Sequence, residues 1–348
     1  MITMAFGESQ AARPSVLVTG GAGYIGSHTC KALAQAGYRP VVYDNLSNGH
    51  VEAVRWGPLI VGDVRDTDLL TEAMRDHAVV GVIHFAGLIE VGRSVVRPDL
   101  FWDHNVNGVA SVVAAMRRSG TRRMVFSSTA AVYGAPQDQR PLVETDPRVP
   151  INPYGDSKLA GERLIAASCT AFGLEAVALR YFNVAGADAE GEIGEAHHPE
   201  THLIPLAIEA AMGGPPLTLF GSDYPTDDGF CVRDYIHVSD LARAHVKALE
   251  LQGVEAGFEA MNLGRGVGAS VREIMTSVSR VCGRATPFAV GPRRAGDPAM
   301  LVADPGRAMT RLNWRPEYQT VQAIIETAVA WRRNPQFGFE RIREAEVA

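Results

Sequence analysis

The most restrictive feature of this sequence is a glycine-rich turn between an apolar run and a helical pattern, Val16-Leu-Val-Thr-Gly-Gly-Ala-Gly-Tyr-Ile-Gly26. The residues from 15 to 18 are small, apolar or β-branched, as is typical of a buried strand. Gly20, Gly23 and Gly26 recur every third residue, and the apolar spacing from Ile25 onward predicts a helix that stops near Gly37. Such a turn lets the backbone approach a pyrophosphate, which the helix N-terminus then binds through its free N–H groups and partial positive charge.

An acidic residue follows where a ribose-binding carboxylate is expected. The next apolar run, Val41-Val-Tyr-Asp44, ends in this acid about 20 residues after the turn. A glycine motif alone is equally typical of a structural turn, but the strand, the helix and the acid together indicate dinucleotide binding. Because Asp44 would repel a 2′-phosphate, we expect NAD rather than NADP.

Composition excludes several classes of protein. The net charge of −6 argues against nucleic acid or an anionic membrane as the main partner. No apolar run approaches the ~18 residues of a membrane span. The four cysteines form no C-x-x-C pair, which indicates a reduced, cytoplasmic setting. The first 14 residues lack the apolar region of a signal peptide and are expected to be a loose leader.

Short apolar runs alternate with helical patterns, which predicts a parallel sheet covered on both faces. The expected strands are 59–62, 81–86, 123–128 and 175–181, and the expected helices are 67–76, 98–118 and 154–172. We therefore expect an α/β fold with a Rossmann-type doubly wound domain over residues 15–184. Frequent glycine and proline after residue 185 predict a smaller α/β substrate-binding domain over 185–348. A helix at 238–251 and a strand at 260–263 are expected to return to the first domain.

Tyr154 and Lys158 carry the clearest catalytic signal. Pro153 is a good first helical residue, and a spacing of four places both side chains on one helix face. A nearby ammonium and a positive nicotinamide ring would lower the tyrosine pKa from about 10, so that Tyr154 could exchange a proton near neutral pH. Tyr-x-x-x-Lys is common on surfaces, but in a dinucleotide-binding fold it indicates catalysis. Thr129, at an upstream strand end, is predicted to hydrogen-bond the reacting hydroxyl; its alternative role is to cap the next turn.

Thr19-Gly-Gly-Ala-Gly-Tyr-Ile-Gly26 and Tyr154-x-x-x-Lys158 resemble the extended short-chain dehydrogenase/reductase family, and most closely its UDP-sugar 4-epimerases. The resemblance runs from about residue 15 to beyond residue 331. Its further motifs are Asp44-Asn-Leu-Ser-Asn48, Gly62-Asp63, His84-Phe-Ala-Gly-Leu88, Asn105-Val-Asn-Gly108, Arg180-Tyr-Phe-Asn183, Phe220-Gly-Ser-Asp-Tyr-Pro-Thr226, Val232-Arg-Asp-Tyr-Ile-His-Val238 and Pro292-Arg-Arg-Ala-Gly-Asp297.

The resemblance implies two adjoining sites. The implied NAD site consists of Gly20, Gly23, Tyr24, Ile25, Gly26, Asp44, Asn45, Leu46, Ser47, Asn48, Gly49, Asp63, Val64, Phe85, Ala86, Gly87, Leu88, Ile89, His104, Tyr154, Lys158 and Phe182. The implied UDP-sugar site consists of Thr129, Tyr154, Asn183, His202, Leu203, Ile204, Thr218, Leu219, Phe220, Arg233, Arg294, Asp297 and Leu301. The two arginines suit a diphosphate, Phe220 or Leu203 suits the uracil ring, and Asp297 suits a ribose hydroxyl.

Four positions depart from the family pattern. Ile89 stands where a lysine is frequent, which removes one cationic contact to the cofactor. His104 and His202 stand where some members carry asparagine, and Thr129 replaces a frequent serine while keeping the hydroxyl.

The implied activity interconverts UDP-glucose and UDP-galactose by transient oxidation at C4, rotation of the 4-keto sugar and return of the hydride. NAD would stay tightly bound because each turnover regenerates it. The alternatives are an epimerase of a UDP-uronic acid, UDP-pentose or UDP-N-acetylglucosamine, and a non-catalytic NAD-sensing module, although such modules tend to lose Tyr154 or Lys158. A nucleotide-sugar 4,6-dehydratase would carry an Asp-Glu pair where this chain has Ala130-Ala131.

The resemblance has two further implications. Helices at 103–118 and 154–172 would form a homodimer interface. Leu301 would wall the pocket beside the 2-substituent of the sugar, where tyrosine excludes N-acetyl groups and a small residue admits them.

His197, His198 and His202, with Glu195 and Glu200, form the one sequence cluster that suggests a metal. We expect no metal there, because the segment contains proline and lacks a regular ligand spacing.

Overall fold

The computed structural model describes residues 13–136, 138–254, 257–294 and 297–339. The predicted leader therefore lies outside the described residues except for its last two positions, and so does the end of the chain from residue 340.

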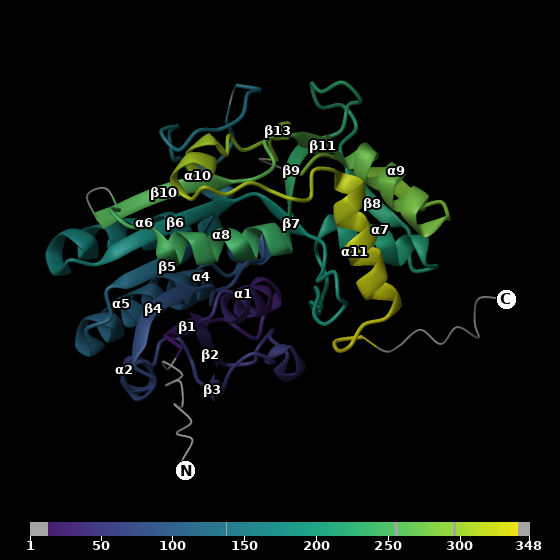
Figure 1. Ribbon diagram of the computed structural model, residues 1–348. Helices are drawn as coiled ribbons and strands as arrows, with labels where there is room; N and C mark the ends of the chain where they lie inside the picture. The colour runs from purple at the N-terminus through teal and green to yellow at the C-terminus, as the bar shows by residue number, and fades with distance from the viewer. Residues whose placement is uncertain (1–12, 137, 255–256, 295–296, 340–348) are drawn as a thin grey trace, which may run out of the picture.

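A seven-stranded sheet forms the centre of the molecule, in the order β10-β6-β5-β4-β1-β2-β3 (Figure 1). Its strands, all parallel to their neighbours, are β1 (Ser15–Thr19), β2 (Arg39–Asp44), β3 (Leu59–Val61), β4 (Val79–His84), β5 (Arg123–Thr129), β6 (Glu175–Tyr181) and β10 (Phe258–Leu263). The strand order reverses between β1 and β4, and ligands of such sheets bind at the carboxyl ends beside this switch point. The predicted doubly wound parallel sheet is confirmed.

Helices cover both faces of this sheet because successive strand residues point to opposite sides. Leu17 enters a core cluster with residues of α2 (Thr67–Asp76), α5 (Gly108–Ser119) and α6 (Pro153–Phe172). Its neighbours Val16 and Val18 enter the opposite cluster, with residues of α1 (Tyr24–Gln35), α8 (Val238–Glu250) and α10 (Gly306–Arg311). Strand β10 and helix α8 therefore complete the central layers although they come late in the sequence.

The helix predicted over 98–118 is interrupted. Short helices α3 (Val91–Val96) and α4 (Pro98–Phe101) lead into a π-helical segment, η2 (Trp102–Asn107), before α5 begins. Segments with π-helical hydrogen bonding are often found at functional sites. Residue-type periodicity does not reveal the extra residue in such a turn, so the sequence predicted a continuous helix.

A second lobe packs beside the sheet, on the right in Figure 1. Its core joins α7 (Leu203–Ala211), α9 (Val271–Cys282) and α11 (Val321–Arg333). Its strands are β7 (Asn183–Ala185), β8 (Leu217–Phe220), β9 (Val232–His237), β11 (Gly268–Ser270), β12 (Phe288–Gly291) and β13 (Met300–Leu301). Two one-turn helices precede this lobe in the sequence, η1 (Val51–Ala53) and η3 (Ala130–Tyr133). The predicted boundary between residues 184 and 185 falls inside β7, which pairs with β9.

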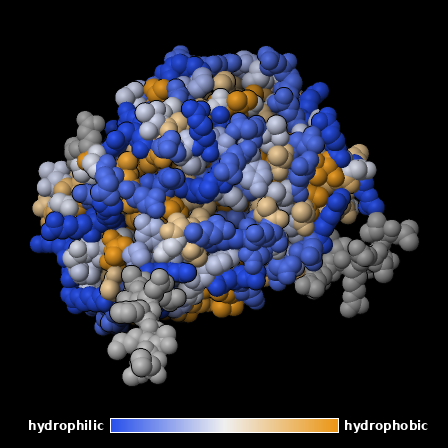
Figure 2. All heavy atoms as spheres, in the orientation of Figure 1, coloured by the Kyte–Doolittle hydropathy of each residue, from blue (hydrophilic) through white to orange (hydrophobic). Residues whose placement is uncertain are grey.

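The surface in Figure 2 is largely hydrophilic, with scattered apolar patches. Among the described residues, no helix combines the length and the apolar character needed to cross a membrane.

Candidate active site

The glycine-rich turn holds the start of α1 against the carboxyl edge of the sheet. Gly20 has a φ of +72°, and a Cβ there would lie 2.7 Å from the backbone nitrogen of Ala86. A Cβ at Gly26 would collide with the carbonyl oxygen of Gly20. Gly23 is the N-cap of α1, and no side chain caps the first-turn N–H groups. The turn therefore forms a backbone cradle whose donors and helix dipole suit an anionic group.

Asp44 lies at the end of β2, beside this cradle. Its Oδ2 accepts a hydrogen bond from the backbone of Ala22 at 3.0 Å, and its Oδ1 accepts one from Leu46 at 2.9 Å. Burial raises the pKa of this carboxyl, against these backbone hydrogen bonds. Leu46 itself turns its side chain toward the hydrophobic core, so it offers the site only its backbone.

Most of the predicted site residues line one cavity of about 700 Å³. They come from the strand ends, the starts of three helices and the connecting loops: Gly20, Gly23, Tyr24, Ile25, Gly26, Asp44, Asn45, Ser47, Asn48, Gly49, Val64, Phe85, Ala86, Gly87, Leu88, Ile89, His104, Thr129, Tyr154, Lys158, Phe182, Asn183, His202, Leu203 and Ile204. The predicted residues outside this lining are Leu46, Asp63, Thr218, Leu219, Phe220, Arg233, Arg294, Asp297 and Leu301. Asp63 is held by the Arg65 guanidinium, which lowers its pKa to about 2.

Tyr154 and Lys158 both face this cavity from the first turns of α6. Asn152 caps that helix by accepting a hydrogen bond from the backbone of Gly155 at 2.9 Å. Lys158 Nζ donates to the carbonyl oxygen of Ser127 at 3.0 Å, so the end of β5 fixes its position. Thr129 Oγ1 accepts from the backbone of Ala131 at 3.1 Å, and it also reaches Tyr154. Thr129 therefore has its capping role while its hydroxyl stays next to the tyrosine.

The part of the expected lowering of the Tyr154 pKa that was assigned to Lys158 is wrong, and the part assigned to the nicotinamide ring stays a prediction. Burial raises the pKa of Tyr154, and only the hydrogen bond from Thr129 opposes that rise. The ammonium is directed at the Ser127 carbonyl, and burial lowers the pKa of Lys158 to about 8. The physical reason is desolvation, which disfavours the charged form of both groups.

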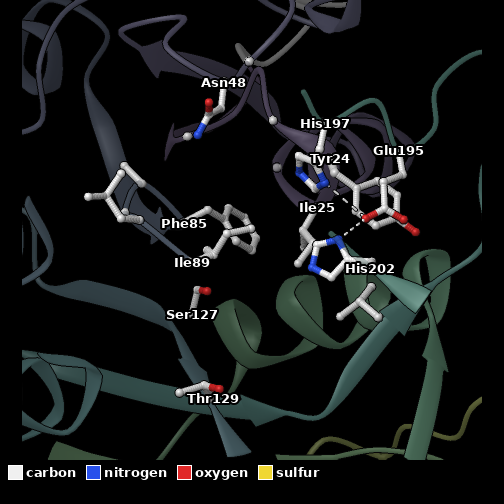
Figure 3. Close-up of a pocket in the computed structure, with 18 of the residues that line it drawn as sticks. Tyr24, Ile25, Asn48, Phe85, Ile89, Ser127, Thr129, Glu195, His197 and His202 are labelled. Carbon is white, nitrogen blue, oxygen red and sulfur yellow. Dashed lines mark ion pairs between the residues drawn. The ribbon is translucent and has the colours of Figure 1, made fainter. Parts of the chain in front are cut away.

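Ser127, Glu195 and His197 line the cavity but were not among the predicted cofactor or substrate residues. Figure 3 shows Ser127 and Thr129 on one side of the cavity, and Tyr24, Glu195, His197 and His202 gathered on another. Burial raises the pKa of Glu195, but the ion pairs with the two histidines bring it down to about 2. The sequence singled out Glu195 and His197 only as members of a metal-like cluster, and their position in the fold brings them to the cavity.

Asn105, also missed, supports the site from the π-helical segment. Its Oδ1 accepts from the backbone of Leu88 at 2.8 Å, and its Nδ2 donates to Ser157 Oγ at 3.0 Å. Ser157 in turn donates to the carbonyl oxygen of Tyr154 at 2.8 Å. This chain of contacts ties the loop after β4 to the start of α6. The motif Asn105-Val-Asn-Gly108 was the available signal for this role.

The predicted residues for the outer part of the substrate form a separate group. Arg233 is paired with Asp297, and the Arg294 guanidinium lies 4.0 Å from the Phe220 ring centroid. Arg233 is two residues before Tyr235 on β9, so both point to the same face, and Tyr235 lines the cavity. Leu219 is buried in the core of the second lobe and cannot contact a ligand through its side chain.

This fold and site define a dinucleotide-binding enzyme with a tyrosine–lysine pair, as in the short-chain dehydrogenase/reductase class. A model of the NAD dependent epimerase/dehydratase family matches residues 16–264. The UDP-glucose 4-epimerase of Rhizobium leguminosarum bv. trifolii is 51% identical over 318 residues, which are 91% of this chain and 97% of that protein. The structure of UDP-glucose 4-epimerase from Brucella ovis in complex with NAD is 50% identical, with a TM-score of 0.88 over 94% of this chain and 99% of that one.

The Bifidobacterium longum UDP-glucose 4-epimerase in complex with NAD⁺ and UDP has the same TM-score of 0.88 at 36% identity, over 93% of this chain and 100% of that one. The chain belongs to the NAD dependent epimerase/dehydratase family. Its own residues fit NAD, because the cradle leaves no room for a Cβ at Gly20 or Gly26 and Asp44 stands at the end of β2.

Replacing Lys158 with methionine tests the cost of its buried charge. The folded pKa is about 8 and the ordinary value is 10.5, so between these values only the unfolded chain keeps the proton. The wild-type protein should therefore gain stability relative to Lys158→Met as pH rises through that window, by at most about 3 kcal/mol. Urea unfolding of both proteins at several pH values measures the difference. A difference that stays constant across the window would contradict the assignment.

Proposed function

We propose that this chain interconverts UDP-glucose and UDP-galactose, with NAD held tightly and regenerated within each turnover. The observation that carries the proposal is the placement of Tyr154, Lys158 and Thr129 in the same cavity as the glycine cradle. The names of the relatives given above support the same activity. Four free cysteines also favour a cytoplasmic location, in keeping with reduced thiols.

NAD, when bound, supplies the chemistry of accepting a hydride from C4 of the sugar and returning it. Gly20, Gly23, Asp44 and the ends of β4 and β5 would hold the cofactor. Tyr154 removes the proton of the 4-hydroxyl and later gives it back, so that the two proton transfers use one side chain. Thr129 fixes the hydroxyl, since its oxygen already lies within reach of Tyr154.

The separate group of Phe220, Arg233, Arg294 and Asp297 is proposed to bind the uridine diphosphate. Arg233 and Arg294 supply fixed positive charge, Phe220 supplies an aromatic face, and Asp297 accepts from a hydroxyl. The 4-keto sugar must rotate within the cavity so that it receives the hydride on its other face. Firm contacts at the diphosphate, with fewer at the hexose, would permit this rotation.

Tyr154→Phe tests the proton-transfer role. The variant keeps the ring but loses the hydroxyl, so turnover of UDP-galactose should fall by ~10²-fold or more while NAD binding persists. Conversion of UDP-galactose to UDP-glucose without added NAD gives the rate, and cofactor content gives the binding. Tyr38→Phe is the matched control, because Tyr38 packs against the core outside the cavity lining. Near-normal turnover by the Tyr154→Phe variant would show that Tyr154 is not the base.

Leu301 is the proposed determinant of sugar specificity. It lies in β13 beside Arg233 and packs against the same cluster as Phe182, which lines the cavity. A partial clash of ~1–3 kcal/mol with an N-acetyl group would reduce activity ten- to a hundredfold without abolishing it. We therefore expect strong preference for UDP-glucose and UDP-galactose, with weak conversion of UDP-N-acetylglucosamine.

Leu301→Ser should raise the N-acetyl activity selectively, and Leu301→Tyr should suppress it. The measurement is the ratio of the two conversion rates for each variant. If both variants keep the parent ratio, the gate lies elsewhere.

The homodimer is likewise a proposal. Large apolar side chains are exposed around α3, η2 and the end of α6: Val95 (65%), Val96 (77%), Trp102 (45%) and Phe172 (41%). Burial of such side chains against a second copy fits the predicted helical interface. Sedimentation at micromolar concentration should give a dimer, and Val96→Glu should weaken it. A stable wild-type monomer would exclude this assembly.

A further inference from the structure

Four side chains of the loop before α7 converge although their spacing along the chain is irregular. Glu195, His197, Glu200 and His202 each present one ligand atom, and these four atoms all lie within 4.8 Å of one another. The Nδ1 of His202 lies 2.7 Å from Glu195 Oε1 and 3.2 Å from Glu200 Oε1, and the Nδ1 of His197 lies 3.2 Å from Glu195 Oε1. Figure 3 shows both imidazole rings turned toward Glu195.

The two imidazole nitrogens lie at ion-pair distance from carboxylate oxygens but not at the angles of hydrogen bonds. The Nδ1 atoms of His197 and His202 and the Oε2 of Glu200 are buried and make no hydrogen bond in the structure. Buried polar atoms outside hydrogen-bonding geometry are uncommon in proteins. Both imidazole nitrogens face the same oxygen, Glu195 Oε1.

The loop that carries these residues is held from outside. Trp331 Nε1 donates to the carbonyl oxygen of Glu195 at 2.9 Å, and His50 Nε2 lies 2.7 Å from that of Ala196. The Tyr24 ring meets His197 edge to face, and its hydroxyl donates to the Gly186 carbonyl at 2.6 Å. Since the backbone is fixed by these contacts, the convergence of the side chains is built into the fold.

The donor set matches a borderline divalent ion. Two imidazole nitrogens with two carboxylates are ligands that Zn²⁺ accepts in tetrahedral geometry, and their net charge of about −2 offsets the ion. Metal–nitrogen bonds of about 2.0–2.1 Å place neighbouring ligand atoms roughly 3.3 Å apart. The three pairs given above are 2.7–3.2 Å apart, and all four ligand atoms lie within 4.8 Å of one another. Four protein ligands leave no open position, as in structural rather than catalytic zinc sites.

We propose that Glu195, His197, Glu200 and His202 bind a divalent transition-metal ion of the Zn²⁺ class in the wall of the cavity. His202 is the N-cap of α7, and the next three residues line the cavity. The ion therefore fixes the start of α7 relative to the loop, and through it one wall of the active site. This assignment reverses the expectation from the sequence, which rested on a proline in the segment and on irregular ligand spacing.

A second acidic group in the same loop provides a matched control. Asp188, Glu190 and Glu192 also converge, but Lys31 Nζ lies 2.7–2.8 Å from an oxygen of each. The ammonium occupies the point where an ion would sit. Glu190→Gln therefore removes a carboxylate of the same loop without touching the proposed ligands.

The test is a titration of the metal-free full chain, purified without a histidine tag, with Co²⁺ and then Zn²⁺. We expect one equivalent of Co²⁺ with the visible absorption of a tetrahedral site, displacement by Zn²⁺, and a higher unfolding temperature with Zn²⁺. His197→Gln and Glu200→Gln should each weaken binding at least tenfold, whereas Glu190→Gln should not. Circular dichroism checks that each variant is folded.

Absence of stoichiometric binding, or equal binding by all variants, would overturn the site and leave an ion-paired cluster. The readout is metal uptake and thermal unfolding, so it does not depend on epimerase activity. If the metal site is disproved, the proposed function still stands. If the proposed function is disproved, the metal site still stands.

Discussion

The buried ion pair between Arg180 on β6 and Glu162 on α6 is the contact on which the active-site geometry depends. Both side chains are about 1% exposed, and the guanidinium binds both carboxylate oxygens, at 2.8 and 2.7 Å. Ser128 Oγ donates to the same carboxylate at 2.5 Å. Removing one partner of such a pair costs ~3–5 kcal/mol, a large part of the ~5–15 kcal/mol that stabilises a domain. The pair therefore locks α6, with Tyr154 and Lys158, onto the strands that end beside Thr129.

The same arginine also connects the two halves of the sequence. Its Nη1 donates to Tyr133 Oη at 2.9 Å, and Tyr133 donates to Asn262 Oδ1 at 2.7 Å. Asn262, on β10, then donates to the carbonyl oxygen of Leu142 at 2.8 Å. A strand from the later half of the chain thus closes the polar network behind the catalytic helix. A fully satisfied buried network of this kind specifies one arrangement of its elements, because any other leaves buried donors unpaired.

Local patterns in the sequence were sufficient for the central sheet and the cofactor cradle. The helix predicted over 67–76 has those same bounds, because Asp66 is its N-cap and its apolar face is periodic. Long-range contacts were beyond such patterns. The π-helical turn at η2, the inward side chain of Leu219 and the direction of the Tyr154 pKa all depend on packing between distant segments. The metal-type convergence of His197 and His202 depends likewise on Trp331 and His50, which lie far away in sequence.

An acidic protein that binds two phosphorylated ligands needs local positive potential. The net charge is −6. Of the lysine and arginine side chains that line the cavity, Lys158 donates to a backbone carbonyl and Arg93 pairs with Glu90. Three helices, α1, α6 and α7, instead present their first residues to the cavity, at Tyr24, Tyr154 and Leu203. The positive ends of their dipoles act together over a short range, where salt screens them least. Binding of anionic ligands is thereby tied to the fold itself: the glycine turn, the Asn152 cap and the loop before α7 each fix one of these helix starts.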